Sequence, residues 1–193
     1  MHKKTVLLFA GLISAVLTGC EKKSAPPAAP TAEAVAAYTE AAFSGNAARV
    51  AEALKNGMPV DQVETNGNSG LMLASFNGHV ETMKTLIDAG ATIDLRDSNG
   101  RTALMFACSG PFPSAVKLLL EHGAEINAVD SGEHWSPVMF AASEGLSPVV
   151  DLLLEHGADP KMVDIDNESS ADFARSRGFP QLADKLQALI DAP

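Results

Sequence analysis

Apolar and polar positions along the chain follow a pattern that returns every 33 or 34 residues. The stretch at residues 118–124, Leu-Leu-Leu-Glu-His-Gly-Ala, recurs letter for letter at residues 152–158. Glycines keep the same period, at Gly57, Gly90, Gly123 and Gly157. A period in the low thirties indicates an array of small units, and each unit must stack on its neighbours to bury its apolar surface.

Each unit predicts two helices followed by a turn that projects as a finger. A serine or threonine that can cap the first helix precedes it in three units, at Ser69, Thr102 and Ser136. The repeated glycines stand where the second helix must end in a left-handed residue. Asn-Gly dipeptides at residues 66–67 and 99–100 are typical of tight turns and mark the finger tips. The pattern therefore predicts an all-α solenoid of stacked helix-turn-helix units with hairpin fingers.

The repeated motifs resemble those of the ankyrin repeat family. Residues 102–107, Thr-Ala-Leu-Met-Phe-Ala, match the family's T-P-L-H-x-A helix, and Gly78-His79 matches its inter-helix turn. The segments ending in Leu-Leu-Glu-His-Gly-Ala match the end of its second helix. The resemblance covers about residues 33–190 and implies about five units, with degenerate first and last units as caps: 33–66, 67–99, 100–132, 133–166 and 167–193.

Three features depart from the family pattern. Methionine replaces the histidine that links neighbouring units in the family, at Met72, Met105 and Met139, so this array should depend more on packing. The third unit has Gly-Pro-Phe-Pro at residues 110–113 in place of the usual turn, which should reshape that corner. The finger between Asp130 and Ser136 has one extra residue.

The N-terminal residues predict export. Lys3 and Lys4 precede a mostly apolar run at residues 6–17, which is shorter than the roughly 20 residues of a membrane span and suits a signal peptide. The run ends in Leu17-Thr18-Gly19-Cys20, which resembles the lipobox of bacterial lipoproteins. That resemblance implies cleavage before Cys20 and a diacylglycerol on its thiol. An ordinary secretory signal with a chance cysteine is the alternative.

The chain therefore divides into a signal peptide at 1–19, an acylated cysteine and flexible tether at 20–32, and a repeat domain at 33–193. The tether is rich in proline and alanine and lacks the large apolar residues that folding needs. Glu21, and not an aspartate, follows Cys20, which by resemblance to bacterial lipoprotein sorting implies an outer-membrane anchor that faces the periplasm. Cys108 is then the remaining cysteine, with core packing or a redox thiol as its two interpretations.

The charge narrows the classes of partner. The formal net charge is -10, and removal of Lys3 and Lys4 with the leader makes it -12. Because phosphate contacts need clustered lysine and arginine, the sequence disfavours nucleic acid, and it also disfavours adsorption to anionic lipid. It favours another protein with a basic patch.

Catalytic motifs are absent from the sequence, which has no G-x-S-x-G, H-E-x-x-H, C-x-x-C or phosphate loop. We therefore expect no catalytic residues, no cofactor, no metal and no small-molecule substrate, and a hydrolase on this scaffold is the disfavoured alternative. His122 and His156 are repeat-equivalent, so they should lie about 8–10 Å apart, too far to share a metal ion. Asp164, Asp166 and Glu168 alternate in a finger but lack the glycine and the spacing of a calcium loop.

Candidate binding residues lie on the fingers and at the ends of the first helices, where the resemblance places partner contacts. They are Trp135, Phe76, Asn77, Arg101, Glu133, His134 and Glu144. Trp135 is the only tryptophan and lies in the irregular finger, so it is either a binding hot spot or a residue that packs back on its neighbours. Phe43 and Phe76 should stack on the concave side, either for contact or as part of the core.

These features together predict a non-enzymatic protein-binding module, held at the outer membrane by its lipid anchor. The resemblance to small exported bacterial ankyrin proteins implies two roles. The first is an accessory protein in peroxide defence that works alongside catalase. The second is an immunity protein that binds and neutralises a secreted toxin at the envelope.

Overall fold

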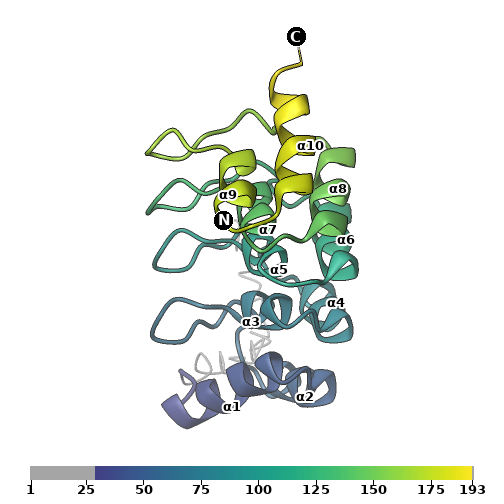
Figure 1. Ribbon diagram of the computed structural model, residues 1–193. Helices are drawn as coiled ribbons and strands as arrows, with labels where there is room; N and C mark the ends of the chain where they lie inside the picture. The colour runs from purple at the N-terminus through teal and green to yellow at the C-terminus, as the bar shows by residue number, and fades with distance from the viewer. Residues whose placement is uncertain (1–28, 193) are drawn as a thin grey trace, which may run out of the picture.

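The computed structural model describes residues 29–192, which form an elongated stack of ten helices in five pairs (Figure 1). The pairs are α1 (Ala32–Phe43) with α2 (Ala47–Lys55), α3 (Gly70–Phe76) with α4 (Val80–Asp88), α5 (Ala103–Cys108) with α6 (Pro113–Glu121), α7 (Pro137–Ser143) with α8 (Ser147–Glu155), and α9 (Ser170–Ser176) with α10 (Pro180–Ile190). The predicted all-α repeat solenoid is confirmed. The predicted signal peptide, Cys20 and most of the tether lie outside the described residues.

The helices form two columns, with the first helix of each pair on the side of the fingers and the second helix on the far side (Figure 1). Neighbouring first helices contact one another from α1 to α9, and neighbouring second helices do so from α2 to α8. Within residues 29–192 the fingers hold isolated bridges, such as Val63 with Ser69, and no strand. None of the described helices combines the length and the apolar character needed to cross a bilayer.

The core consists of small and aliphatic side chains that recur along the stack. A leucine from the second helix of each of the last four units is fully buried: Leu86, Leu119, Leu153 and Leu186. An alanine from each matching first helix is fully buried as well: Ala74, Ala107, Ala141 and Ala174. Cys108 is also fully buried, and burial raises the pKa of its thiol, which keeps it protonated. This environment matches the core-packing interpretation of Cys108.

The helices begin and end at the predicted residues. Ser69 Oγ caps α3, whereas the hydroxyls of Thr102 and Ser136 make no capping hydrogen bond. Gly57, Gly90, Gly123 and Gly157 follow the second helices with φ of 92°, 87°, 82° and 93°. This is the left-handed conformation that glycine adopts without steric cost. His122 and His156 close two of these helices, because the Nδ1 atom of each lies 2.8 Å from the carbonyl oxygen four residues earlier. Each histidine therefore has a local role at a helix end.

A ring from three of the inter-helix turns packs against the turn of the preceding unit. The rings of His79, Phe112 and Phe179 lie so close to Gly45, Gly78 and Gly145 that a Cβ atom at these glycines would clash. The corner of the third unit is reshaped as expected, because Pro111 occupies the position at which the other units have a glycine with positive φ. The proline ring forbids positive φ. The Phe112 N–H accordingly donates to Gly110 O at 2.8 Å, whereas the equivalent His79 N–H donates to Ala74 O.

Polar links between units occur at positions other than those of the methionines that replace the family's histidine. Met72, Met105 and Met139 are buried, as expected for packing residues. However, a side-chain oxygen from each of three units accepts the backbone N–H of the next unit, in the pairs Asp61 with Thr92 at 2.9 Å, Asp94 with Glu125 at 3.0 Å and Asn127 with Asp159 at 2.9 Å. The array therefore combines packing at the three methionines with polar links between units.

Candidate binding face

Backbone hydrogen bonds join the fingers into a row. The N–H groups of Ser98, Ser131 and Ile165 donate to carbonyl groups one finger earlier, those of Asn66, Asn99 and Glu133, at 3.2, 2.8 and 3.1 Å. The bonding atoms recur with the repeat, so each finger is held in register with its neighbour. The fingers and the first helices thus form one continuous face along the stack (Figure 1).

The finger with the extra residue keeps the same closure. Trp135 O accepts the N–H of Asp130, and Asp130 Oδ1 accepts the N–H of Trp135 at 3.0 Å. The equivalent bonds in the preceding finger join Asp97 with Arg101, four residues apart instead of five. His134 has a φ of 61°, at the position where the other fingers have Gly67, Gly100 and Asn167. The insertion therefore places a histidine in a left-handed conformation, which L-residues adopt at a cost.

Three phenylalanines, Phe43, Phe76 and Phe106, form the Phe76 group at the N-terminal half of this face. The Phe43 and Phe76 rings stack with centroids 6.4 Å apart, and the Phe76 and Phe106 rings meet edge to face at 6.2 Å. Phe43 and Phe76 are 42% and 44% exposed. The predicted stacking of Phe43 on Phe76 is confirmed, and both rings keep apolar area in contact with water.

Asn77, the other candidate at the end of α3, has a structural role. Its Nδ2 donates to Phe43 O at 2.8 Å, and His79 Nε2 lies 3.0 Å from the same oxygen. Both side chains therefore link the second unit to the first. A substitution at Asn77 would disturb this link as well as any contact with a partner.

Arg101 is held tightly within its own finger. Its Nε and Nη2 atoms donate to Asp97 Oδ2 at 3.0 and 2.8 Å, and its guanidinium carbon lies 4.7 Å from the centroid of the Phe106 ring. The Asp97 side chain is only 1% exposed. Because a buried carboxylate without a counter-charge is costly, Arg101 cannot leave Asp97 without destabilising the finger.

Three further aromatic residues, Trp135, Phe140 and Phe173, form the Trp135 group at the C-terminal half of the face. The Trp135 ring lies 5.3 Å from the Phe140 ring and 4.4 Å from the Phe173 ring, centroid to centroid. Trp135 is half-buried and Phe173 is buried. The structure thus contains the packing that was one of the two interpretations of Trp135, and part of the indole stays accessible to a partner.

The remaining candidates are spread along the same face. Arg101, Glu133 and Trp135 line one recess of about 280 Å³ between two fingers, together with Phe140. Glu133 and His134 are exposed on the finger, and Glu144 is exposed at the C-cap of α7. The structure therefore brings Arg101, Glu133 and Trp135 together and keeps Glu144 apart from them. Asn77 and Phe76 belong to the other half of the face.

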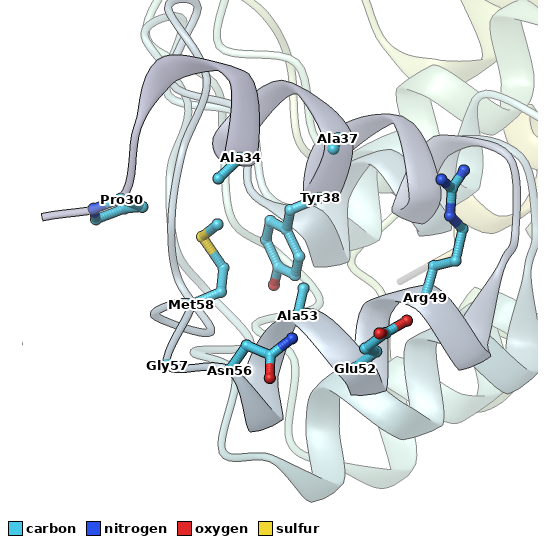
Figure 2. A pocket seen from close by; sticks show the side chains of 10 residues that line it. All are labelled: Pro30, Ala34, Ala37, Tyr38, Arg49, Glu52, Ala53, Asn56, Gly57 and Met58. Carbon is cyan, nitrogen blue, oxygen red and sulfur yellow. The ribbon is translucent and has the colours of Figure 1, made fainter.

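A larger recess of about 360 Å³ lies at the N-terminal end of the stack, between α1 and α2 (Figure 2). Tyr38 points into the space between the two helices, with Met58 on one side and Glu52 on the other (Figure 2). The Tyr38 hydroxyl donates to Val60 O at 2.7 Å, and burial, aided by the nearby charge of Asp61, raises its pKa. This phenol is therefore a structural hydrogen-bond donor that joins α1 to the chain after α2.

Metal-binding clusters of histidine, cysteine, aspartate and glutamate are absent from the part of the chain that the structure describes. In the finger considered for calcium, Asp164 Oδ1 accepts the N–H groups of Asp166 and Glu168 at 2.9 and 2.8 Å. These bonds close the finger tip, and they explain the acidic residue at position 164 without a metal ion.

Comparison with known proteins identifies the repeated unit. A family model described as ankyrin repeats (3 copies) matches residues 38–130 and also residues 71–164. The two matches overlap, and together they extend over more than half of the chain. No curated protein matches the chain.

Proposed function

The chain belongs to the ankyrin repeat family, whose members are protein–protein interaction modules, and we propose that it is a non-enzymatic binder held at the outer membrane and facing the periplasm. Its binding surface is the continuous face of fingers and first helices. Candidate residues on that face are Trp135, Phe76, Arg101, Glu133, His134 and Glu144, with Asn77 as a support for Phe43.

The observation that carries the proposal is the exposure of two large phenylalanines side by side. Phe43 and Phe76 stack on each other and are more than 40% exposed. The equivalent residues in the next two units are Ser109 and Ser143. Exposed aromatic residues in a contiguous patch are typical of binding surfaces and give most of the binding energy in interfaces.

The charge of the chain supports a basic partner protein over nucleic acid. The formal net charge is -10. Exposed or partly exposed carboxylates lie along the binding face, at Glu40, Glu64, Glu133, Glu144 and Glu168. A negative surface raises the association rate of a positively charged partner and repels a phosphate backbone.

The lipobox-like sequence Leu17-Thr18-Gly19-Cys20 supports anchoring through an acylated Cys20, and Glu21 supports the outer membrane. A Cys20→Ser substitution should leave the precursor uncut and without lipid, because the serine hydroxyl is not the thiol that the lipid transfer requires. Metabolic labelling with a radioactive fatty acid, followed by membrane fractionation, measures this. A shortened, lipid-labelled Cys20→Ser protein would contradict the anchor.

Two roles suit an acidic binder at the envelope. Our preferred role is that of an accessory protein in peroxide defence. The alternative is an immunity protein that neutralises a secreted toxin, which is favoured by a membrane anchor because the toxin is met at the envelope. Identification of the captured partner separates these roles: a catalase or peroxide-handling protein supports the first, and a secreted hydrolase or nuclease supports the second.

The test is capture of a partner from solubilised envelope by the full chain and by its Phe76→Ala variant. We expect the wild-type chain to retain a discrete partner that Phe76→Ala loses. A Glu121→Gln variant, changed in an exposed residue of α6 on the far column, is the matched control and should retain it. Loss of the partner in the control but not in Phe76→Ala would refute this binding face.

A further inference from the structure

The finger that carries Asp97 and Arg101, just before α5, shows how this face holds a basic side chain. The Arg101 guanidinium pairs with Asp97 at 2.8 Å and lies 4.7 Å from the Phe106 ring centroid. A carboxylate next to an aromatic face is a favourable environment for guanidinium, which is planar, weakly hydrated and always charged. This finger and α5 therefore form a binding site for a guanidinium group, and Arg101 of the chain itself occupies it.

The preceding finger and α3 have the same construction without the arginine. Glu64 takes the position of the carboxylate and Leu73 that of the apolar floor, each 33 residues earlier. Asn68 replaces Arg101 and, with its Nδ2 2.6 Å from Glu64 Oε1, does not extend over the floor as a longer side chain would. A recess of about 270 Å³ opens at this point, and its lining includes Glu40, Phe43, Glu64 and Leu73.

The next finger along the chain, together with α7, repeats the construction on the other side of the Arg101 site. Asp130 takes the position of the carboxylate, and Phe140 takes that of the floor. Trp135 replaces Arg101, so the floor gains a second ring while the cation is lost. The recess here measures about 280 Å³, and Glu133 adds another carboxylate at its rim.

An anionic ligand does not fit the recess that contains Trp135, although Arg101 lines it. Arg101 compensates Asp97, whose side chain is 1% exposed, and a new anion would have to compete with this buried carboxylate. Leaving such a carboxylate unpaired is strongly unfavourable. The carboxylates of Asp130 and Glu133 would also repel an anion. The recess therefore favours a cation.

The two open sites are separated by two repeat units, with the filled site between them. At about 10 Å for each pair of packed helices, this is a separation of about 20 Å. An extended peptide rises about 3.3 Å per residue, so side chains about six residues apart can reach both sites. The repeat thus sets the spacing as well as the chemistry of the ligand.

We propose that the recess lined by Phe43 and Glu64 and the recess lined by Trp135 and Glu133 each take an arginine side chain from the partner. The partner then presents an extended segment with two arginines about six residues apart. This inference rests on the proposed protein-binding function and specifies the ligand of the same face. In each recess the guanidinium lies on the apolar floor and pairs with the carboxylates, as Arg101 does in the unit between them.

A synthetic peptide tests the inference without knowledge of the natural partner. The probe is a glycine and serine peptide with two arginines about six residues apart. Its controls are the same peptide with its arginines adjacent, which keeps the charge, and with one arginine replaced by glutamine. Trp135 is the only tryptophan of the chain, so a guanidinium in its recess should change the intrinsic fluorescence. Titration of the full chain then gives the Kd of each peptide.

We expect the spaced peptide to bind at least about tenfold more tightly than either control peptide, because linkage makes the second contact intramolecular. The double variant Glu40→Gln with Glu133→Gln should weaken its binding about tenfold, since two charge contacts are lost. Both carboxylates are exposed, so folding should be unaffected. The matched double variant, Glu121→Gln with Glu155→Gln, removes the same charge from α6 and α8 and should change the Kd by less than about twofold, because salt screens exposed charges on another face.

Equal affinity for spaced and adjacent arginines, equal loss in the two double variants, or no binding of the spaced peptide would each overturn the inference. These failures are distinct from failure of the proposed function, which is tested by capture of the natural partner and its loss in Phe76→Ala. A chain that captures its partner through Phe76 but ignores the spacing of arginines is a protein binder with another ligand chemistry.

Discussion

The Phe76 group and the Trp135 group lie on the same face of the solenoid and differ in what covers their rings. In the Phe76 group, Phe43 and Phe76 come from equivalent helix positions and lie next to each other with more than 40% of each side chain exposed. In the Trp135 group, the indole extends from a finger to Phe173 of the next unit, which is only 6% exposed. Rings of similar size therefore leave exposed apolar area in one half and close a gap between units in the other.

The position of each ring in the repeat explains this difference. Phe76 at the end of α3 has the rings of Phe43 and Phe106 as neighbours, yet Phe43 and Phe76 both stay more than 40% exposed. Trp135 begins on a finger and has Phe140 and Phe173 within reach on two successive first helices. An aromatic residue on this face therefore contributes to binding or to stability according to how much of its ring its neighbours cover.

A substitution in the core has the largest expected effect on the free energy of unfolding, and the other effects can be compared with it. Leu119 is fully buried in α6. Leu119→Ala should lower the free energy of unfolding by about 2–5 kcal/mol, because it removes buried methyl groups and leaves a cavity. Chemical denaturation followed by circular dichroism measures the loss. An unchanged midpoint would show that Leu119 does not support the stack.

Trp135→Ala tests the Trp135 group, in which neighbouring rings cover the indole. Since Trp135 is half-buried against two rings, its loss should lower the free energy of unfolding by about 2 kcal/mol, less than a fully buried aromatic residue would. The same denaturation experiment measures this. Unchanged stability together with lost affinity would reverse the comparison and make Trp135 a contact residue alone.

Phe76→Ala tests the Phe76 group, in which the rings stay exposed. Because the ring is 44% exposed, its loss should lower the free energy of unfolding by less than about 1 kcal/mol. The same change should weaken partner binding by about 2 kcal/mol if the ring is a hot spot. Thermal melting and a binding titration on one sample provide both values. A large fall in stability would place Phe76 with the core and not with the binding surface.

His134→Gly has the smallest expected effect and concerns the finger that carries Trp135. His134 has a φ of 61°, where other fingers have glycine or asparagine. Glycine removes a strain of about 1 kcal/mol, and its greater freedom in the unfolded chain offsets part of this gain. We expect a stabilisation of less than about 1 kcal/mol in thermal melting. Destabilisation would show that the His134 side chain makes a stabilising contact.

The fold followed from the sequence because each unit repeats the same local signals. The glycines that end the second helices and the serines that begin the first helices recur with the period, and the structure places them at those ends. Pro111 at a position that needs positive φ predicted the altered corner of the third unit. Stacking of Phe43 on Phe76 followed from their separation of 33 residues. Periodic features need no knowledge of tertiary contacts.

The candidate site was harder to predict because its residues differ between units. Nothing in the sequence near Asn77 indicates that its amide donates to Phe43 O, a contact 34 residues away. The burial of Asp97 under Arg101 also depends on packing between a finger and a helix. The links made by Asp61, Asp94 and Asn127 recur with the period, and this regular spacing was a signal that could have identified them.

We propose that partners bind the face of fingers and first helices and that the Phe76 group is their main contact. Site-specific photocrosslinking in intact envelope tests it most directly, with benzoylphenylalanine introduced at Phe76 in one protein and at Lys117, exposed on α6 in the far column, in another. We expect a discrete crosslinked partner from position 76 and none from position 117. A crosslinked partner from position 117 with none from position 76 would contradict it.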